Sequence, residues 1–214
     1  MIPQPPKAPK QQPISVTLSK LLFVEGDTPM HFFEALLRNL RLEQEVEIRN
    51  FRGVGDFKTF LINLAHTAEF QRLVTSVGIV RDAEDKPAAH ARQSVEYALT
   101  AAGLTPQRTP PIQTSIFILP DNTNPGMIET LCMEAVKTEP ALADTHRCVE
   151  DFFACLTRSN IALPAPPLLA KSHAQAYLAT RQEAQMFPGL AAYRGYWPWT
   201  AAAFQPLIHF LQLL

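Results

Sequence analysis

A short apolar run that ends in a group of acids constrains the fold of this chain most. The run is Val77–Val80, and the residues RDAEDKP follow it as far as Pro87. A strand without alternating polar residues is typical of the middle of a parallel sheet, where helices cover both faces. Three carboxylates, Asp82, Glu84 and Asp85, follow its carboxyl end. Ligand sites in open α/β sheets gather at such strand ends, so this stretch is a candidate site.

Carboxylates this close in the sequence repel one another unless a cation or a proton relieves them. A divalent cation that binds through oxygen ligands, such as Mg²⁺, suits a group of this kind. The alternative is a solvated acidic turn that caps the following helix. The three acids alone do not decide between these readings, so the choice depends on the rest of the chain.

Strands and helices alternate through the first half of the sequence. Apolar or alternating runs predict strands at 20–24, 46–51, 77–80 and 115–119. Helical spacing predicts three intervening helices, at 29–40 with Thr28 as N-cap and Pro29 as its first residue, at 57–64, and at 88–102. This order predicts a mostly parallel sheet, flanked by helices, with right-handed crossovers.

The second half of the sequence is predicted to be helical. Helices are expected at 126–137, 142–158, 168–183 and 201–214, with an aromatic loop at 195–199. We therefore expect one α/β domain over residues 14–214, with its sheet core at about 18–125 and a helical C-terminal extension at about 126–214. Residues 1–13 are rich in Pro, Gln and Lys and predict a flexible tail.

The composition excludes some classes of protein. A length of 214 residues suits one sizeable core. A formal net charge of −1 gives no basic field of the kind that nonspecific DNA-binding proteins carry. We expect no membrane span and no secretory signal, because no apolar run is long enough. The three cysteines lack zinc-site spacing and are expected to be reduced, buried thiols of a cytoplasmic protein. Cys148 and Cys155 are seven residues apart, which predicts that both lie on one buried helix face.

A second acidic strand end supports the metal-site interpretation. Glu25 and Gly26 end the first strand, and Asp82, Ala83 and Glu84 end the third. In this order, the two strand ends resemble the TOPRIM domain of topoisomerases, primases and nucleases. That domain has a Glu after its first strand and a DxD motif after a later strand, which together hold Mg²⁺.

The match with the TOPRIM pattern is complete at two positions and changed at a third. Glu25 matches the Glu of the pattern, and Asp82 matches the first Asp. Glu84 stands where the pattern has its second Asp, and Asp85 follows it. The resemblance therefore leaves the further metal ligand open between Glu84 and Asp85.

The resemblance extends into the C-terminal half. The segment 119–131 is similar to the one that follows the fourth strand in nucleases of the overcoming-lysogenisation-defect type, and Glu129 matches an acid there. Lys171 resembles the lysine that those nucleases place on a helix near the metals. From about residue 18 to 214 the chain is similar to small, standalone, uncharacterised bacterial TOPRIM-like proteins. No GxxxxGK[ST] loop occurs, so an ATPase partner would have to be a separate chain.

The resemblance implies a divalent-metal-dependent phosphodiester hydrolase or transferase, and a nuclease acting on DNA or RNA above all. Mg²⁺ or Mn²⁺ would be held by the acids Glu25, Asp82, Glu84 or Asp85, and Glu129. The metal would polarise the phosphodiester and activate water. Glu25, Asp82 and Lys171 would be catalytic, with Lys171 neutralising charge on the phosphate or the leaving oxygen.

Other readings of these residues stay open at this point. Glu25 could cap the following helix, because carboxylates are favoured near helix N-termini. The whole chain could be a non-catalytic module that binds nucleic acid, nucleotide or protein, or a structural subunit whose apolar C-terminal helix docks elsewhere.

Two further groups of residues are candidates for nucleic-acid contacts. Arg49 and Arg52 flank a glycine turn that contains Gly53 and Gly55, and these four could bind phosphate; exposed arginines of this kind usually face solvent instead. The aromatic residues near the C-terminus could stack on bases, although packing over a core is favoured; they are Tyr193, Tyr196, Trp197 and Trp199.

Overall fold

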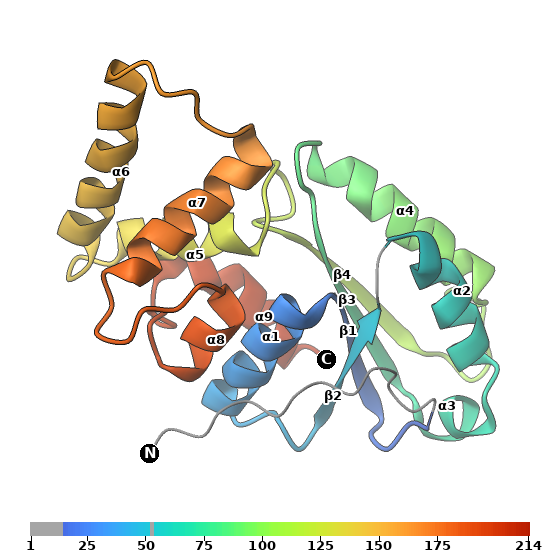
Figure 1. Ribbon diagram of the computed structural model, residues 1–214. Coiled ribbons are helices and arrows are strands. Elements are labelled where there is room, and N and C mark those ends of the chain that lie inside the picture. Colours follow the sequence, from blue (N-terminus) through green and yellow to red (C-terminus); the bar gives the residue numbers. More distant parts are fainter. Residues whose placement is uncertain (1–14, 52–53) are drawn as a thin grey trace.

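The computed structural model of the protein describes residues 15–51 and 54–214, without the side chains of residues 54–56 and 167. In these residues, four parallel strands form one sheet in the order β2-β1-β3-β4 (Figure 1). The strands are β1 Lys20–Glu25, β2 Val46–Phe51, β3 Ser76–Asp82 and β4 Gln113–Leu119. The predicted α/β class and parallel sheet are confirmed. The predicted tail at 1–13 lies outside the described residues.

The helices connect and cover these strands. Their bounds are α1 Asp27–Leu40, α2 Val54–Ala65, α3 Ala68–Leu73, α4 Ala88–Ala101, α5 Ile128–Thr138, α6 Ala143–Arg158, α7 Pro166–Ala179, α8 Pro188–Tyr193 and α9 Gln205–Gln212, with a short 3-10 helix, η1, at Ala202–Phe204. The predicted C-terminal helices are present, although α7 ends at Ala179 rather than near residue 183. The sequence analysis missed the short helices α3 and α8.

Successive residues of β1 point into two different cores. Leu21 and Phe23 pack with α2, α3 and α4 on one face of the sheet. Leu22 and Val24 pack with α1 and the C-terminal helices on the other face. Figure 1 shows α2 and α4 on one side of the sheet and α1, α8 and α9 on the other. Because both faces are covered, the central strands carry apolar residues at consecutive positions.

The helix after β1 starts earlier than the sequence predicts. Its N-cap is Gly26 with φ 90°, and Asp27 is its first residue, so Thr28 does not cap it. Within the described residues, no side-chain hydrogen bond caps α1, so Glu25 makes no capping hydrogen bond there. A positive φ favours glycine, which explains why the tight exit from β1 has Gly at position 26.

The C-terminal helix α9 packs on the sheet of its own chain. The rings of Phe117 on β4 and Phe210 on α9 lie 5.5 Å apart. A Cβ placed on Gly78 of β3 would lie 2.7 Å from a methyl carbon of Leu214, so glycine lets the chain end lie against the strand. The apolar face of α9 is thus covered intramolecularly, which removes the argument that this helix docks on another protein.

Helix α6 contradicts one sequence expectation. The spacing of Cys148 and Cys155 predicts that both lie on a buried face, yet both are exposed. The buried residues of α6 are Val149, which follows Cys148, and Phe153, which lies two residues before Cys155. The buried face of α6 is therefore a different face from the one that the cysteine spacing predicts.

Candidate functional site

A pocket of about 230 Å³ lies at the carboxyl ends of β1 and β3. Helices α5 and α7 and the segment that leads into α8 complete its walls. It is lined by Glu25, Thr28, Pro29, Asp82, Ile128, Glu129, Lys171, Ala174, Gln175, Met186, Phe187 and Pro188. Four residues predicted from separate parts of the sequence, namely Glu25, Asp82, Glu129 and Lys171, are thus brought together in one place.

Asp82 is the last residue of β3, next to the start of α5. The backbone amide of Ile128, the first residue of α5, donates a hydrogen bond of 3.1 Å to Oδ1 of Asp82. A helix N-terminus carries unsatisfied N–H groups and a partial positive charge, so a carboxylate is favoured there. This contact fixes Asp82 in the pocket and aligns α5, which carries Glu129, with the end of β3.

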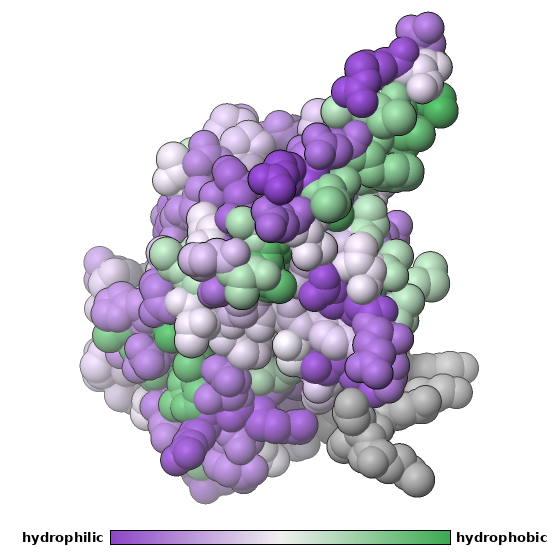
Figure 2. Space-filling view, turned by 90° about the vertical axis from the view of Figure 1, so that its left-hand side faces the viewer, coloured by the Kyte–Doolittle hydropathy of each residue, from purple (hydrophilic) through white to green (hydrophobic). Residues whose placement is uncertain are grey.

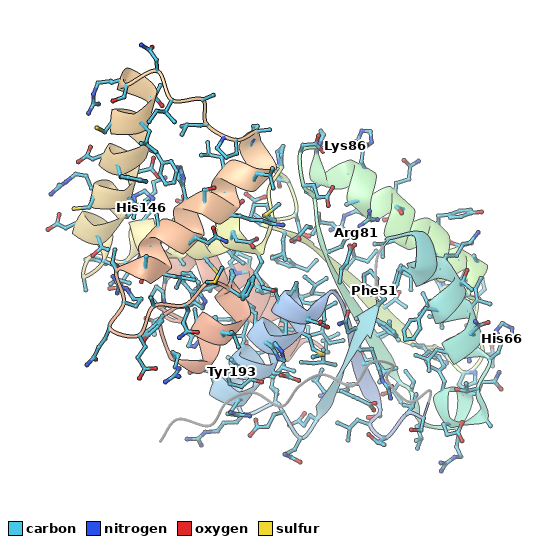
Figure 3. All side chains as sticks on the ribbon, in the orientation of Figure 1. Phe51, His66, Arg81, Lys86, His146 and Tyr193 are labelled. Carbon is cyan, nitrogen blue, oxygen red and sulfur yellow. The ribbon has the colours of Figure 1, made fainter. Side chains whose placement is uncertain are left out.

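Glu25 is held by the turn between β1 and α1. The amide of Gly26 donates to Oδ1 of Asn50 over 2.8 Å, and Nδ2 of Asn50 donates to Oδ1 of Asp27 over 2.8 Å. The Glu25 carboxylate lies 3.9 Å from Nε of Arg81, whose position at the carboxyl ends of the strands is shown in Figure 3. At this distance the ion pair is loose, so the Glu25 carboxylate can take another partner.

Glu129 and Lys171 come from α5 and α7. Glu129 is buried in the first turn of α5, and Lys171 is exposed on α7. The positive charge of Lys171 lowers the pKa of both Asp82 and Glu129, but in each case other effects outweigh it. Among the described residues, Lys171 is the only basic residue that lines the pocket.

Burial raises the pKa values of all three acids in the pocket. Burial, followed by the negative charges of Glu129 and Glu25, raises the pKa of Asp82 to about 7. Burial also raises the pKa of Glu129. For Glu25, burial raises the pKa, Arg81 opposes this, and Glu84 adds to it. Burial therefore disfavours the charged form of each acid, and for Asp82 the neighbouring carboxylates add to this effect.

The remaining predicted acids lie outside the pocket lining. Glu84 is exposed, has φ 59°, and pairs through its backbone with Gly126. It is still close enough to raise the pKa of Glu25. Asp85 is exposed in the following turn. Of the two residues that the TOPRIM pattern left open, the structure thus favours Glu84 as the one nearer to the site.

Arg49, one of the predicted phosphate-binding residues, does not line this pocket. Arg49 is buried, and its guanidinium donates to the carboxylate of Glu47 and to the carbonyl of Ser15. Arg52 and Gly53 lie outside the described residues, and Gly55 is the second residue of α2. A role for Arg49 at the acidic pocket would require it to leave a buried ion pair.

The pocket offers oxygen ligands of the kind that Mg²⁺ and Mn²⁺ bind. Among the residues that the structure describes, however, no group of three or more His, Cys, Asp or Glu side chains is arranged to hold a metal ion. This arrangement still suits Mg²⁺, which keeps several of its waters and is often bound through only one or two carboxylates. Asp82, with Glu25 or Glu129, would supply those carboxylates.

A second pocket, of about 350 Å³, shares Glu129 with the first. In it, Nε2 of His146 and Nδ1 of His173 lie 3.7 Å and 3.5 Å from the same oxygen of Glu150. The ring of His173 also lies 4.1 Å from that of Phe153. His173 therefore joins α7 to α6 and is not a free surface histidine.

The aromatic residues near the C-terminus pack inside the molecule, as favoured from the sequence. Trp197 is buried and stacks on Tyr177 at 5.5 Å, and Trp199 lies 5.2 Å from Phe32. The hydroxyl of Tyr193, near α1 in Figure 3, donates to Glu34. None of these residues lines the acidic pocket.

Two residues that line the acidic pocket, Met186 and Phe187, are not predicted as site residues from the sequence. One local signal was available, because Pro188 at the first position of α8 marks a helix start directly after Phe187. That signal predicts a helix, but it does not show that the segment returns to the strand ends.

Comparison with known protein families places the chain. A family model described as "Protein of unknown function (DUF3226)" matches residues 19–214. The chain belongs to this family. The match spans the sheet and the C-terminal helices. No curated protein and no solved structure matches the chain. Within the described residues, no helix is both long and apolar enough to cross a membrane.

Proposed function

We propose that this DUF3226 protein is a TOPRIM-like, divalent-cation-dependent phosphodiester hydrolase or transferase, and most specifically a nuclease on DNA or RNA. One observation carries the proposal. Glu25, Asp82 and Glu129, which come from three different elements, line one pocket together with Lys171. The pocket lies at the carboxyl ends of two adjacent central strands, where open α/β sheets bind their ligands.

The charges of the pocket support a cation requirement. Three carboxylates face one ammonium group, so a phosphodiester would be repelled from the pocket on its own. When bound by Asp82 with Glu25 or Glu129, Mg²⁺ or Mn²⁺ supplies polarisation of the phosphodiester and activation of water. The raised pKa of Asp82 agrees with this, because a bound cation would replace the proton that this carboxyl group otherwise takes up near neutral pH.

The residues of the chain have separate roles in this proposal. The Ile128 amide keeps Asp82 oriented, and Arg81 gives the Glu25 carboxylate a loose ionic partner that a cation can replace. Lys171 offsets negative charge that develops on the phosphate or the leaving oxygen, an electrostatic role that requires no proton transfer.

A second candidate function is that of a non-catalytic module that binds nucleic acid, nucleotide or protein. It is favoured by the absence, in the described part of the chain, of a preassembled group of three metal ligands. Such a module would retain salt-sensitive nucleic-acid binding without turnover.

Cleavage assays separate the two functions. Wild type and Asp82→Ala are incubated with labelled single- and double-stranded DNA and RNA, with Mg²⁺, with Mn²⁺ or with EDTA. The nuclease proposal predicts cleavage that needs the metal and is lost in Asp82→Ala, while Asp85→Ala, a matched change at an exposed acid outside the pocket lining, retains it. Metal-independent cleavage, or the same cleavage by Asp82→Ala, contradicts the proposal. Binding without cleavage supports the module.

Two further parts of the proposal concern the setting of the protein. The described cysteines Cys132, Cys148 and Cys155 are free thiols, which agrees with a cytoplasmic location. A separate ATPase subunit, as in the larger nucleases that the sequence resembles, stays a prediction. Copurification from native cells, followed by identification of a nucleoside-triphosphatase, tests it.

A further inference from the structure

Part of the wall of the acidic pocket is apolar and open to solvent. Met186 is 65% exposed and Phe187 is 48% exposed, and both line the pocket that contains Asp82 and Lys171. Two consecutive exposed large apolar side chains beside a charged pocket suit a ligand that has both a charged group and an apolar face.

The backbone of Phe187 is firmly held. Phe187 is the N-cap of α8, and its carbonyl accepts a hydrogen bond of 3.1 Å from the amide of Ala191. The next carbonyl, that of Pro188, accepts one of 2.9 Å from Nε1 of the buried Trp197. A short helix and a buried indole thus fix the position from which the Phe187 ring projects.

Helix α8 is also pressed against the start of α1. A Cβ placed on Gly189 would lie only 2.4 Å from the carbonyl oxygen of Thr28. Thr28 and Pro29 follow Glu25 by three and four residues and line the same pocket. The backbone beside Phe187 is therefore held close to the start of α1, so binding a ligand there does not require this segment of the backbone to be ordered first.

We propose that Phe187 is a stacking platform for an unpaired nucleobase, next to the phosphate that the acidic end of the pocket receives. This inference rests on the proposed function and names its substrate class, which is single-stranded nucleic acid or an unpaired strand end. Aromatic side chains stack on every base, because every base has a π-face. A base inside a duplex has both faces covered by its neighbours, so the Phe187 ring cannot reach it. Met186 adds an apolar contact beside the ring.

Equilibrium binding tests the platform. The probe is a fluorescein-labelled oligothymidylate, measured by anisotropy with Ca²⁺ in place of Mg²⁺ so that the strand stays intact. Removal of one stacking side chain costs about 1–3 kcal/mol, so Phe187→Ala is expected to weaken binding roughly five- to 150-fold, while Phe187→Trp retains it. Phe152→Ala is the matched control, because Phe152 is 52% exposed on α6 and does not line this pocket.

An abasic strand of the same length separates stacking from a general structural effect. Wild type is expected to lose affinity for the abasic strand by the factor that Phe187→Ala loses on the normal strand. The Phe187→Ala variant is expected to bind both strands alike, since the ring and the base act as one pair. Equal weakening on both strands, or no weakening on either, overturns the inference.

Competition experiments identify the source of the base. Strong competition by unlabelled single strands and weak competition by a blunt duplex support a polynucleotide substrate. Strong competition by thymidine monophosphate alone assigns the platform to free nucleotides and overturns the polynucleotide class.

Calorimetric titration of Mn²⁺ into wild type and Phe187→Ala distinguishes failure of the stacking platform from failure of the proposed function. Unchanged Mn²⁺ binding by Phe187→Ala, together with base-independent strand binding by wild type, contradicts only the platform. Absent Mn²⁺ binding in wild type contradicts the proposed function itself.

Discussion

The amide of Ile128 donates a hydrogen bond of 3.1 Å to Oδ1 of Asp82. This contact joins the carboxyl end of β3 to the first residue of α5, two positions that are 46 residues apart. It brings the acid that follows on α5, Glu129, to the same pocket as the acids at the strand ends. The site therefore depends on the C-terminal helices as much as on the sheet.

Asp82 makes stability depend on pH. Its pKa is raised to about 7 from the model-compound value of 3.8, so the folded protein binds this proton more tightly than the unfolded chain does. The stabilisation of the folded state by this proton is fully present below about pH 4 and is lost as the pH rises through about 7. The pKa difference corresponds to at most about 4 kcal/mol, and solvent access to the half-buried carboxyl group reduces this.

The Asp82→Asn variant is expected to remove this pH dependence. The amide oxygen can still accept from the Ile128 amide, and the side chain no longer ionises. The free energy of unfolding of the variant minus that of wild type should be larger at pH 8 than at pH 5, because only wild type loses stability as Asp82 ionises. Urea denaturation at both pH values measures it. A constant difference between the two proteins would mean that Asp82 does not titrate in this range.

Lys171→Met is expected to separate metal binding from cleavage. Loss of the positive charge leaves the acids more negative, so Mn²⁺ binding should be unchanged or tighter. Loss of an electrostatic contact to the reacting phosphate should lower the cleavage rate by about 10²–10³-fold. Calorimetry and single-turnover cleavage measure the two effects. Lys137→Met, at an exposed lysine paired with Glu134 at 3.0 Å, is the matched control and should leave both unchanged.

Gly189→Ala is expected to push α8 away from α1. The new Cβ would lie 2.4 Å from a backbone oxygen of Thr28, which cannot move aside without moving α1. We expect a loss of about 1–3 kcal/mol in the free energy of unfolding. The control is Gly78→Ala, because the atoms that meet its Cβ are side-chain ends of Leu214 and Phe210, which can shift. A larger loss for Gly78→Ala would contradict this account.

Tyr193→Phe is expected to affect stability and leave metal binding unchanged. The Tyr193 hydroxyl donates to Glu34, and burial together with Glu34 raises the pKa of this hydroxyl. The variant should lose about 1 kcal/mol of unfolding free energy, measured by thermal denaturation. Altered Mn²⁺ affinity in this variant would show that the contact between α8 and α1 shapes the metal site.

The sequence predicted the sheet and its acidic edge well, for a physical reason. A strand that is covered by helices on both faces needs apolar residues at consecutive positions, as in Val77–Val80. Parallel strands also place their carboxyl ends at one edge of the sheet. Glu25 and Asp82 could therefore be paired before the structure was known. Glu129 and Lys171 came from the resemblance alone, because no local pattern shows where α5 and α7 pack.

Other features depended on tertiary packing that short patterns do not show. Arg49 lies in a strand whose alternating pattern suits an exposed arginine, but its side chain is buried in an ion pair with Glu47. The stripe of Cys148 and Cys155 has helical spacing, but α6 buries the neighbouring face. Phe187 is an ordinary residue before a proline, and only the contact of α8 with α1 brings it to the site.

Calorimetric titration of Mn²⁺ and Mg²⁺ into wild type, Glu25→Gln, Asp82→Ala and Asp85→Ala tests the central claim most directly. Saturable binding to wild type and Asp85→Ala, with loss in both Glu25→Gln and Asp82→Ala, would support one cation site built from two strand ends. Absence of binding to wild type at millimolar metal, or undiminished binding to Asp82→Ala, would contradict it.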